Sequence, residues 1–220
     1  MRDHAVTDEP VRLTSFTFPG PAGALEGLWK EGRPPVRGSA VFAHPHPLHG
    51  GTLHNKVVYR AAQALVSSGF GTLRFNFRGT GVSRGTHDRG VGEVEDFRAA
   101  MDETERRGGL PMVAGGFSFG SSVALRAIAG DPRVTAYIGV GLPVATPAVT
   151  DAALPRVPSL FVVGQRDTFG PPRLLRDFVG ASHQIVEVAA ADHFLEGKLD
   201  VLEQAITSFL AGLTLPPRTP

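Results

Sequence analysis

A serine flanked by glycines is the feature of this sequence that most directly suggests chemistry. Gly116, Ser118 and Gly120 form a G-x-S-x-G pattern where a short apolar run gives way to a helical pattern beginning near Ser121. A tight strand-to-helix turn needs small residues around its exposed serine, because larger side chains would clash where the backbone folds back. The positive end of the following helix also favours negative charge there. The pattern predicts a nucleophile at Ser118, with a plain connecting turn as the alternative.

A serine hydroxyl is inert at neutral pH unless a base accepts its proton. Only two histidines, His183 and His193, follow Ser118 in the chain. His183 opens a strand pattern, whereas His193 comes after one, and open α/β sheets place their chemistry at the carboxyl ends of strands. We therefore expect His193 to be the base.

An acid must orient the histidine, and Asp167 is the expected residue. It follows the apolar run at 159–164, again at the carboxyl end of a predicted strand, and lies between Ser118 and His193 in the chain. Asp192 is the rival, but a residue next to the histidine seldom curls back to the inner nitrogen of the ring. We expect Asp192 to form a turn or to cap the last helix.

The elements that would position these residues alternate between strand and helix. Apolar runs predict strands at 39–44, 72–77, 111–117, 134–143, 159–165 and 183–189. Helical spacing predicts helices at 56–68, 93–107, 121–129, 173–179 and 195–213. Alternating patterns at 11–19 and 24–30 predict an antiparallel edge hairpin. Continuous apolar strands with helical crossovers indicate an α/β fold, a mostly parallel doubly wound sheet preceded by that hairpin. Glu93, Glu95 and Asp96 open the second helix, where we expect them to complement its dipole.

The composition excludes several classes of protein. At about 150 residues per domain, 220 residues favour one domain covering residues 1–220. Mean hydropathy is zero and no run of 18 apolar residues occurs, so a membrane bundle is not expected. The first ten residues carry charges and no apolar segment follows, so we expect a cytoplasmic protein without a secretory signal. The absence of cysteine excludes disulfides, thiolate metal sites and a cysteine nucleophile.

Charge bears on the expected partner. The 22 basic and 21 acidic residues nearly cancel and are interspersed, which argues against nucleic-acid or membrane binding. A neutral small molecule is the expected partner, and a homodimer is compatible with the sequence.

Four segments together resemble the α/β-hydrolase superfamily, and within it small lidless bacterial serine hydrolases of the dienelactone-hydrolase-like and short-chain carboxylesterase group. They are AHPHPLHGG at 43–51, RFNFRGTGVS at 74–83, the serine turn at 116–120 and the loops at Asp167 and His193. The resemblance implies a catalytic triad of Ser118, Asp167 and His193. It departs from many relatives at Asn76, where they carry aspartate.

The resemblance also implies an oxyanion hole. The family uses the amide of the residue after the nucleophile, here Phe119, and an amide from the loop after the third strand. Pro45 and Pro47 in that loop have no amide hydrogen, which leaves His46 and Leu48 as candidates. The sequence does not decide between them.

A metal site is the alternative interpretation of the same loop. His44, His46, His49 and His54 are close in sequence, and imidazole is a common ligand. No carboxylate lies among them, and the triad accounts for the neighbouring motifs, so we expect neither a metal nor a cofactor. No G-x-G-x-x-G follows a predicted strand, which argues against a nucleotide site.

The expected function follows from the triad and from the short segment 145–158, which has no room for a lid domain. An uncovered serine suits soluble esters with short acyl chains. Four phenylalanines flank the triad and could form an acyl-binding wall or pack in the core: Phe117, Phe119, Phe169 and Phe194. We expect a carboxylesterase. The alternatives are a thioesterase or peptidase-type hydrolase on the same triad, or a catalytically silent scaffold that binds a ligand.

Overall fold

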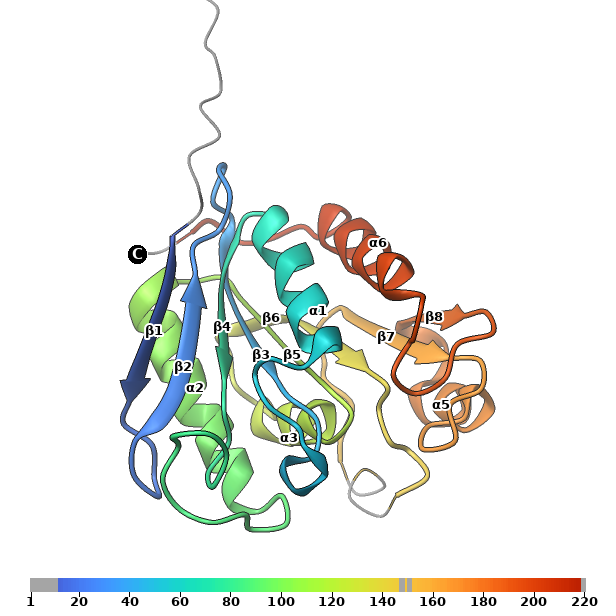
Figure 1. Ribbon diagram of the computed structural model, residues 1–220. Helices are drawn as coiled ribbons and strands as arrows, with labels where there is room; N and C mark the ends of the chain where they lie inside the picture. The colour runs from blue at the N-terminus through green and yellow to red at the C-terminus, as the bar shows by residue number, and fades with distance from the viewer. Residues whose placement is uncertain (1–11, 147–148, 150–151, 219–220) are drawn as a thin grey trace, which may run out of the picture.

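Eight strands form one sheet in the computed structural model, which describes residues 12–146, 149 and 152–218 (Figure 1). The strands are β1 Leu13–Phe18, β2 Leu25–Lys30, β3 Gly38–Ala43, β4 Phe70–Phe75, β5 Met112–Phe117, β6 Val134–Val140, β7 Ser159–Gly164 and β8 Gln184–Val188. The helices are α1 Lys56–Ser67, α2 Gly92–Gly108, α3 Phe119–Ala127, α5 Pro172–Val179 and α6 Leu199–Ala211, with short 3-10 turns η1 Pro47–His49 and η2 Gly180–Ser182. The start predicted for the first strand, residue 11, lies outside the described residues.

The sheet order is β1-β2-β4-β3-β5-β6-β7-β8. β1 pairs with β2 and β2 with β4 in antiparallel fashion, and every later pair is parallel. The predicted fold class is confirmed, including the antiparallel hairpin at the amino-terminal edge. Because all strands from β3 onward run the same way, their carboxyl ends meet at one edge of the sheet.

Helices cover both faces of the sheet and divide the core into two layers (Figure 1). On one face α1 and α6 pack against each other, and Leu65 and Ile206 are fully buried there. On the other face lie α2, α3 and α5, where Phe97 and Leu175 are fully buried. All residues of β3, β4, β5 and β7 are buried, which explains why these strands have continuous apolar patterns instead of alternating ones.

Two predicted helix starts are wrong. α3 begins at Phe119, directly after the serine, instead of near Ser121. The hydroxyl of Ser121 donates a hydrogen bond to the carbonyl of Ser118 at 2.6 Å, so this small side chain lies within the first turn. α6 begins at Leu199 and not at residue 195, because Leu195 and Gly197 have left-handed φ angles of 53° and 69° that interrupt a helix.

Two predicted strands also shift. β4 begins at Phe70 and ends at Phe75, earlier than the predicted 72–77, because the amide of Phe77 turns away to donate to the ring of His44. β6 ends at Val140 and not at residue 143, since Gly141 has a φ of 54° that ends the extended conformation. Both shifts occur at the sheet edge that carries the site.

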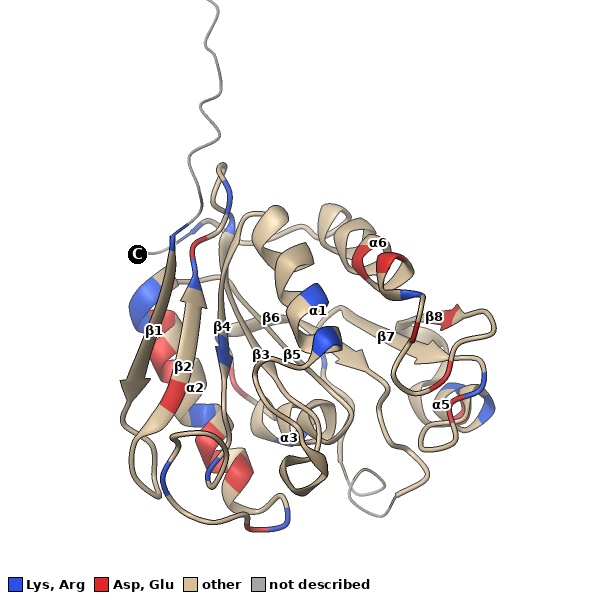
Figure 2. Ribbon diagram, viewed as in Figure 1, with Lys and Arg blue, Asp and Glu red and all other residues tan. Residues whose placement is uncertain are grey.

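Charges of both signs share the same surface elements, as Figure 2 shows for α2. Within α2, Arg98 pairs with Glu95 at 2.5 Å and Arg106 with Glu103 at 2.6 Å, both at i,i+3 spacing. Among the described residues, no helix combines the length and the apolar character that crossing a membrane requires.

Candidate active site

Ser118 lies in a strained turn between β5 and α3. Its φ of 54° and ψ of −121° are unusual for a residue with a side chain, and its amide donates to the carbonyl of Val140 on β6 at 2.8 Å. A Cβ on Gly116 would lie 2.5 Å from the carbonyl oxygen of Gly120, and a Cβ on Gly120 would lie 2.4 Å from that of His44. Both glycines are therefore required by close backbone contacts, as the G-x-S-x-G pattern indicated.

The serine, histidine and aspartate singled out in the sequence come together in one hydrogen-bonded chain. His193 Nε2 lies 2.9 Å from Ser118 Oγ, and His193 Nδ1 lies 2.7 Å from Asp167 Oδ2. The second oxygen of Asp167 accepts hydrogen bonds from the amides of Phe169 at 2.9 Å and Gly170 at 3.0 Å. This geometry can draw a proton from the serine to the ring while the buried carboxylate stabilises the charge that the ring gains.

The loops after β7 and β8, which carry Asp167 and His193, are hydrogen-bonded to each other. The amide of Arg166 donates to the carbonyl of Ala191 at 2.8 Å, and the amide of Ala190 donates to the side chain of Gln165 at 3.0 Å. These contacts connect the two loops independently of Ser118. They help to hold Asp167 and His193 next to each other.

The two alternative residues, Asp192 and His183, make other contacts. Asp192 accepts hydrogen bonds from the amides of Phe194 at 3.0 Å and Glu196 at 3.3 Å, which is the expected turn-forming role. His183 precedes β8 at the opposite end of that strand and packs against Phe161, with ring centroids 6.0 Å apart. Neither residue contacts Ser118.

An open cleft of about 400 Å³ contains the serine. Its described lining residues are Pro45, His46, His49, Gly50, Gly51, Asn55, His87, Arg89, Ser118, Phe119, Ser122, Pro143, Thr146, Phe169, His193 and Phe194. Three of the four flanking phenylalanines thus line the cleft, whereas Phe117 is fully buried in the core beneath the His193 ring.

The loop after β3 presents one of its two candidate amides to the cleft. Within the described part of the chain, the amides of His46 and Phe119 have no protein acceptor, and both residues line the cleft. The amide of Leu48 instead donates to His46 Nδ1 at 3.3 Å, and the Leu48 side chain is 69% exposed outside the cleft. A Cβ on Gly51 would lie 2.1 Å from the carbonyl oxygen of Pro45, so a glycine there lets the loop close on itself.

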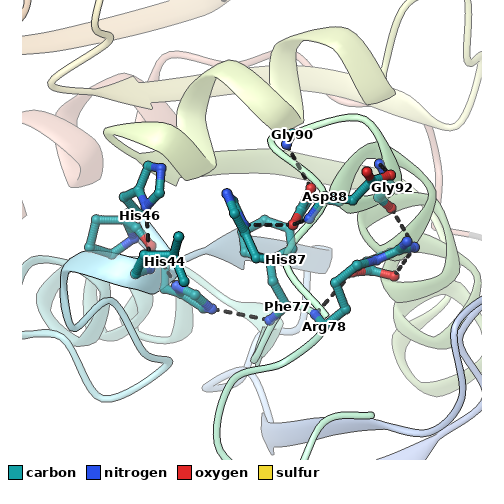
Figure 3. A network of polar contacts seen from close by, with 12 residues as sticks. His44, His46, Phe77, Arg78, His87, Asp88, Gly90 and Gly92 are labelled. Carbon is teal, nitrogen blue, oxygen red and sulfur yellow. Dashed lines mark hydrogen bonds and ion pairs between the residues drawn. The ribbon is translucent and has the colours of Figure 1, made fainter. Parts of the chain in front are cut away.

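His44 supports this loop from inside the protein. Nδ1 of its buried ring lies 2.6 Å from the carbonyl oxygen of Pro45. Nε2 accepts a hydrogen bond from the amide of Phe77 at 3.1 Å (Figure 3). Burial lowers the pKa of His44 to about 4, so the ring is neutral at physiological pH, as its accepting nitrogen requires. Burial also lowers the pKa of His46, and the neighbouring rings of His49 and His87 add to this effect.

The histidines do not converge as metal ligands do. Among the described residues, no group of three or more histidine, aspartate or glutamate side chains is arranged to hold a metal ion. His46 and His49 are instead stacked, with ring centroids 4.5 Å apart.

The acidic start of α2 does more than complement the helix dipole. Asp96 is fully buried and pairs with Arg78 through both carboxylate oxygens, at 2.9 and 2.8 Å. Glu93 is also fully buried, and its carboxylate accepts the amides of Asp88 at 2.8 Å and Gly90 at 2.7 Å. The expectation of a dipole role is incomplete, because these side chains also bind the backbone of the β4–α2 loop. Figure 3 shows Arg78, Asp88 and Gly90 of this loop.

Asn76 at the end of β4 also binds neighbouring segments. Its Oδ1 accepts the amide of Leu53 at 2.8 Å, and its Nδ2 donates to Glu26 at 2.7 Å. An amide side chain can accept on one side and donate to a carboxylate on the other, which an ionised aspartate cannot do. These two contacts explain why asparagine suits this position.

Sequence reasoning missed several cleft residues, among them His87 and Arg89. The His87 ring lies 4.9 Å from that of His46 and 5.7 Å from that of Phe119. His87 Nδ1 is 2.8 Å from a carboxylate oxygen of Glu93, although the two are not aligned for a hydrogen bond. One signal could have found them, since they lie in the loop that leaves the carboxyl end of a predicted strand, where such sheets bind ligands.

A doubly wound sheet with a strained serine turn and a hydrogen-bonded histidine and aspartate at its carboxyl edge defines the α/β-hydrolase class. Residues 38–203 match the alpha/beta hydrolase domain family, and this chain belongs to that family.

Solved structures agree with this assignment. An α/β serine hydrolase homologue from Coxiella burnetii is 34% identical, with 89% of this chain and 96% of that chain covered and a TM-score of 0.84. A member of the α/β serine hydrolases without a lid from Xanthomonas campestris is 31% identical, with 96% and 99% covered and a TM-score of 0.85. An uncharacterized protein of Rickettsia prowazekii is 34% identical over 90% of this chain and 89% of its own length.

Proposed function

We propose that this protein is a serine carboxylesterase that hydrolyses short-chain carboxylic esters. The observation that carries the proposal is the continuous hydrogen-bond chain from Asp167 through His193 to Ser118, which opens into a cleft. Membership of a family with serine hydrolase homologues supports the same chemistry. Ser118, His193 and Asp167 are the proposed nucleophile, base and orienting acid.

The proposed reaction proceeds in two acyl transfers. Ser118 Oγ attacks the ester carbonyl while His193 Nε2 takes its proton, and the amides of Phe119 and His46 hold the negative oxygen that forms. His193 then gives the proton to the leaving alcohol, which leaves the acyl group on the serine. A water molecule loses its proton to His193, attacks the acyl-serine and releases the carboxylic acid and the free serine.

Short acyl chains fit the cleft best. Its volume of about 400 Å³ leaves little room for a long acyl chain. The lidless relative from Xanthomonas campestris supports an uncovered serine here too. Long-chain lipids need a larger apolar surface than a cleft of this size provides.

The test is hydrolysis of 4-nitrophenyl esters from acetate to palmitate by the wild-type protein and by Ser118→Ala. We expect activity on short chains, and a loss of several orders of magnitude in kcat in the variant. A fluorophosphonate probe should label the wild type and not the variant. Near-normal turnover by Ser118→Ala, or activity that rises up to palmitate, would contradict the proposal. Absence of both turnover and labelling would favour the silent ligand-binding scaffold.

A further inference from the structure

The cleft has two chemically different ends. At one end the rings of Phe169 and Phe194 lie 4.7 and 5.4 Å from the ring of His193. At the other end the ring of His87 lies beside that of His46, 4.9 Å away (Figure 3). The serine turn lies between them, because Ser118 contacts His193 and the next residue packs against both other histidines.

The histidine end is also the basic end. Among the described residues that line the cleft, Arg89 is the one side chain with a permanent charge, and none of them is acidic. No ion pair within the described ranges involves Arg89. A cation without a protein counter-ion in a ligand-sized cleft is suited to bind an anionic group of the ligand.

Glu93 holds this end of the cleft in a fixed shape. It accepts hydrogen bonds from the amides of Asp88 and Gly90, the residues on either side of Arg89, at 2.8 and 2.7 Å. These bonds hold Arg89 in the left-handed region, at a φ of 52°. The same carboxylate lies 2.8 Å from His87 Nδ1. A single buried side chain therefore positions both basic residues, which lowers the entropy cost of binding a ligand.

The Glu93 carboxylate does not face an anion in the cleft directly. Its side chain is fully buried, it does not line the cleft, and two amide donors and the His87 ring surround its oxygens. With Nδ1 of His87 facing this carboxylate, Nε2 is the nitrogen left for a ligand. A carboxylate ligand at Nε2 requires a hydrogen on that nitrogen, and a hydrogen on Nδ1 would face Glu93.

The proposed mechanism indicates which part of the substrate reaches this end. His193 gives its proton to the leaving alcohol, so the alcohol lies near His193 and its two phenylalanine neighbours. The acyl chain then extends away from His193, toward His87 and Arg89. A group bound there belongs to the acid part of the ester.

We propose that His87 and Arg89 bind a carboxylate at the far end of the acyl chain, so that half-esters of dicarboxylic acids are the preferred substrate class. This inference rests on the proposed esterase function. It adds that the acyl group carries a negative charge, where a neutral partner was expected from the sequence.

The test compares mono-4-nitrophenyl esters of adipic and suberic acid with the same esters capped by a methyl group, which are neutral. We expect kcat/KM of the wild type to favour the charged esters about tenfold, and the ratio to shrink as salt is raised. Arg89→Gly removes the charge and accepts a left-handed backbone, and His87→Phe retains a ring against Phe119. Each should lower the ratio severalfold.

Arg173→Gln is the matched control, because Arg173 is exposed on α5 and does not line the cleft, so its ratio should equal that of the wild type. A wild type that hydrolyses the capped esters equally well overturns the carboxylate subsite, and so does an unchanged ratio in Arg89→Gly. Binding to Ser118→Ala, followed by calorimetry, separates the two proposals. Tighter binding of the charged ester without turnover in the wild type supports the subsite and contradicts the esterase function, whereas equal binding of both esters contradicts the subsite.

Discussion

At the residue scale, the two carboxylate oxygens of Asp167 have different hydrogen-bond partners. Oδ1 accepts two backbone amides, from Phe169 and Gly170, and Oδ2 faces the ring of His193. The amides fix which way the carboxyl group is turned. The protonated nitrogen of the neutral ring is therefore Nδ1, and Nε2 is free to accept the serine proton.

Replacement of Asp167 by asparagine tests this division. The two amides would retain the carbonyl oxygen, so the side-chain NH₂ would face His193 Nδ1 and force the proton onto Nε2, where it cannot serve as a base. We expect kcat on 4-nitrophenyl butyrate to fall about 10³-fold or more for Asp167→Asn, with thermal unfolding little changed. Activity within a few fold of the wild type would contradict this account of the tautomer.

Asn76 supports a second prediction at this scale. Asn76→Asp would place a carboxylate about where the amide now donates to Glu26 at 2.7 Å. Repulsion and the lost donor should lower the free energy of unfolding by about 1–3 kcal/mol at pH 8, measured in urea. The loss should shrink at acidic pH, where one carboxyl takes up a proton. An unchanged stability at pH 8 would contradict the contact.

At the scale of elements, the site depends on how closely α3 approaches the end of β3. Gly120 on α3 faces the backbone of Ala43 and His44, which lead into the loop after β3. The turn at Ser118 and this loop therefore share one contact. A change in this contact moves both at once.

Gly120→Ala should therefore affect activity as well as stability. A Cβ would lie 2.4 Å from the carbonyl oxygen of His44, so the helix and the strand must separate. We expect a loss of about 2 kcal/mol or more in the free energy of unfolding, with a large fall in kcat. Gly212→Ala, whose nearest contact would be an ordinary 3.6 Å, is the control and should retain both properties. Equal behaviour of the two variants would argue against the close approach.

Helices and strands could be predicted from the sequence wherever a pattern of neighbouring residues determines them. The strand and helix order and the proposed nucleophile turn could be predicted because continuous apolar runs and paired glycines are properties of neighbouring residues. The start of α6 could not, since the left-handed Leu195 carries no glycine-like signal. The buried roles of Glu93 and Asp96 were missed because each depends on a loop that folds back over its own helix.

At the scale of the whole molecule, the cleft assembles from distant parts of the chain. The β3 loop, the β4–α2 loop, the serine turn and the two late loops meet only because parallel strands bring their carboxyl ends to one edge (Figure 1). This is why His87 and Arg89 escaped prediction while Ser118 did not. The order of motifs along the chain predicts which motif residues form one site. It does not predict which other loops contact that site.

The buried His44 should make global stability depend on pH. Because burial lowers its pKa to about 4, the unfolded chain takes up a proton below its ordinary value of 6.5 while the folded protein does not. The contribution of His44 is thus fully present above pH 6.5 and is lost as the pH falls toward about 4, a decrease of about 3 kcal/mol. Urea unfolding of the wild type and of His44→Gln over this range would measure it. Parallel pH profiles for the two proteins would contradict the assignment.

The serine turn offers a use that its geometry makes selective. The chain contains no cysteine, so Ser118→Cys would introduce a single thiol, on a strained turn that faces an open cleft. A fluorophore or spin label attached there would occupy the cleft next to His193 and report on one point of the molecule. The same position would thus become a spectroscopic handle, one per chain, on the environment of the cleft itself, without any need to know the natural substrate.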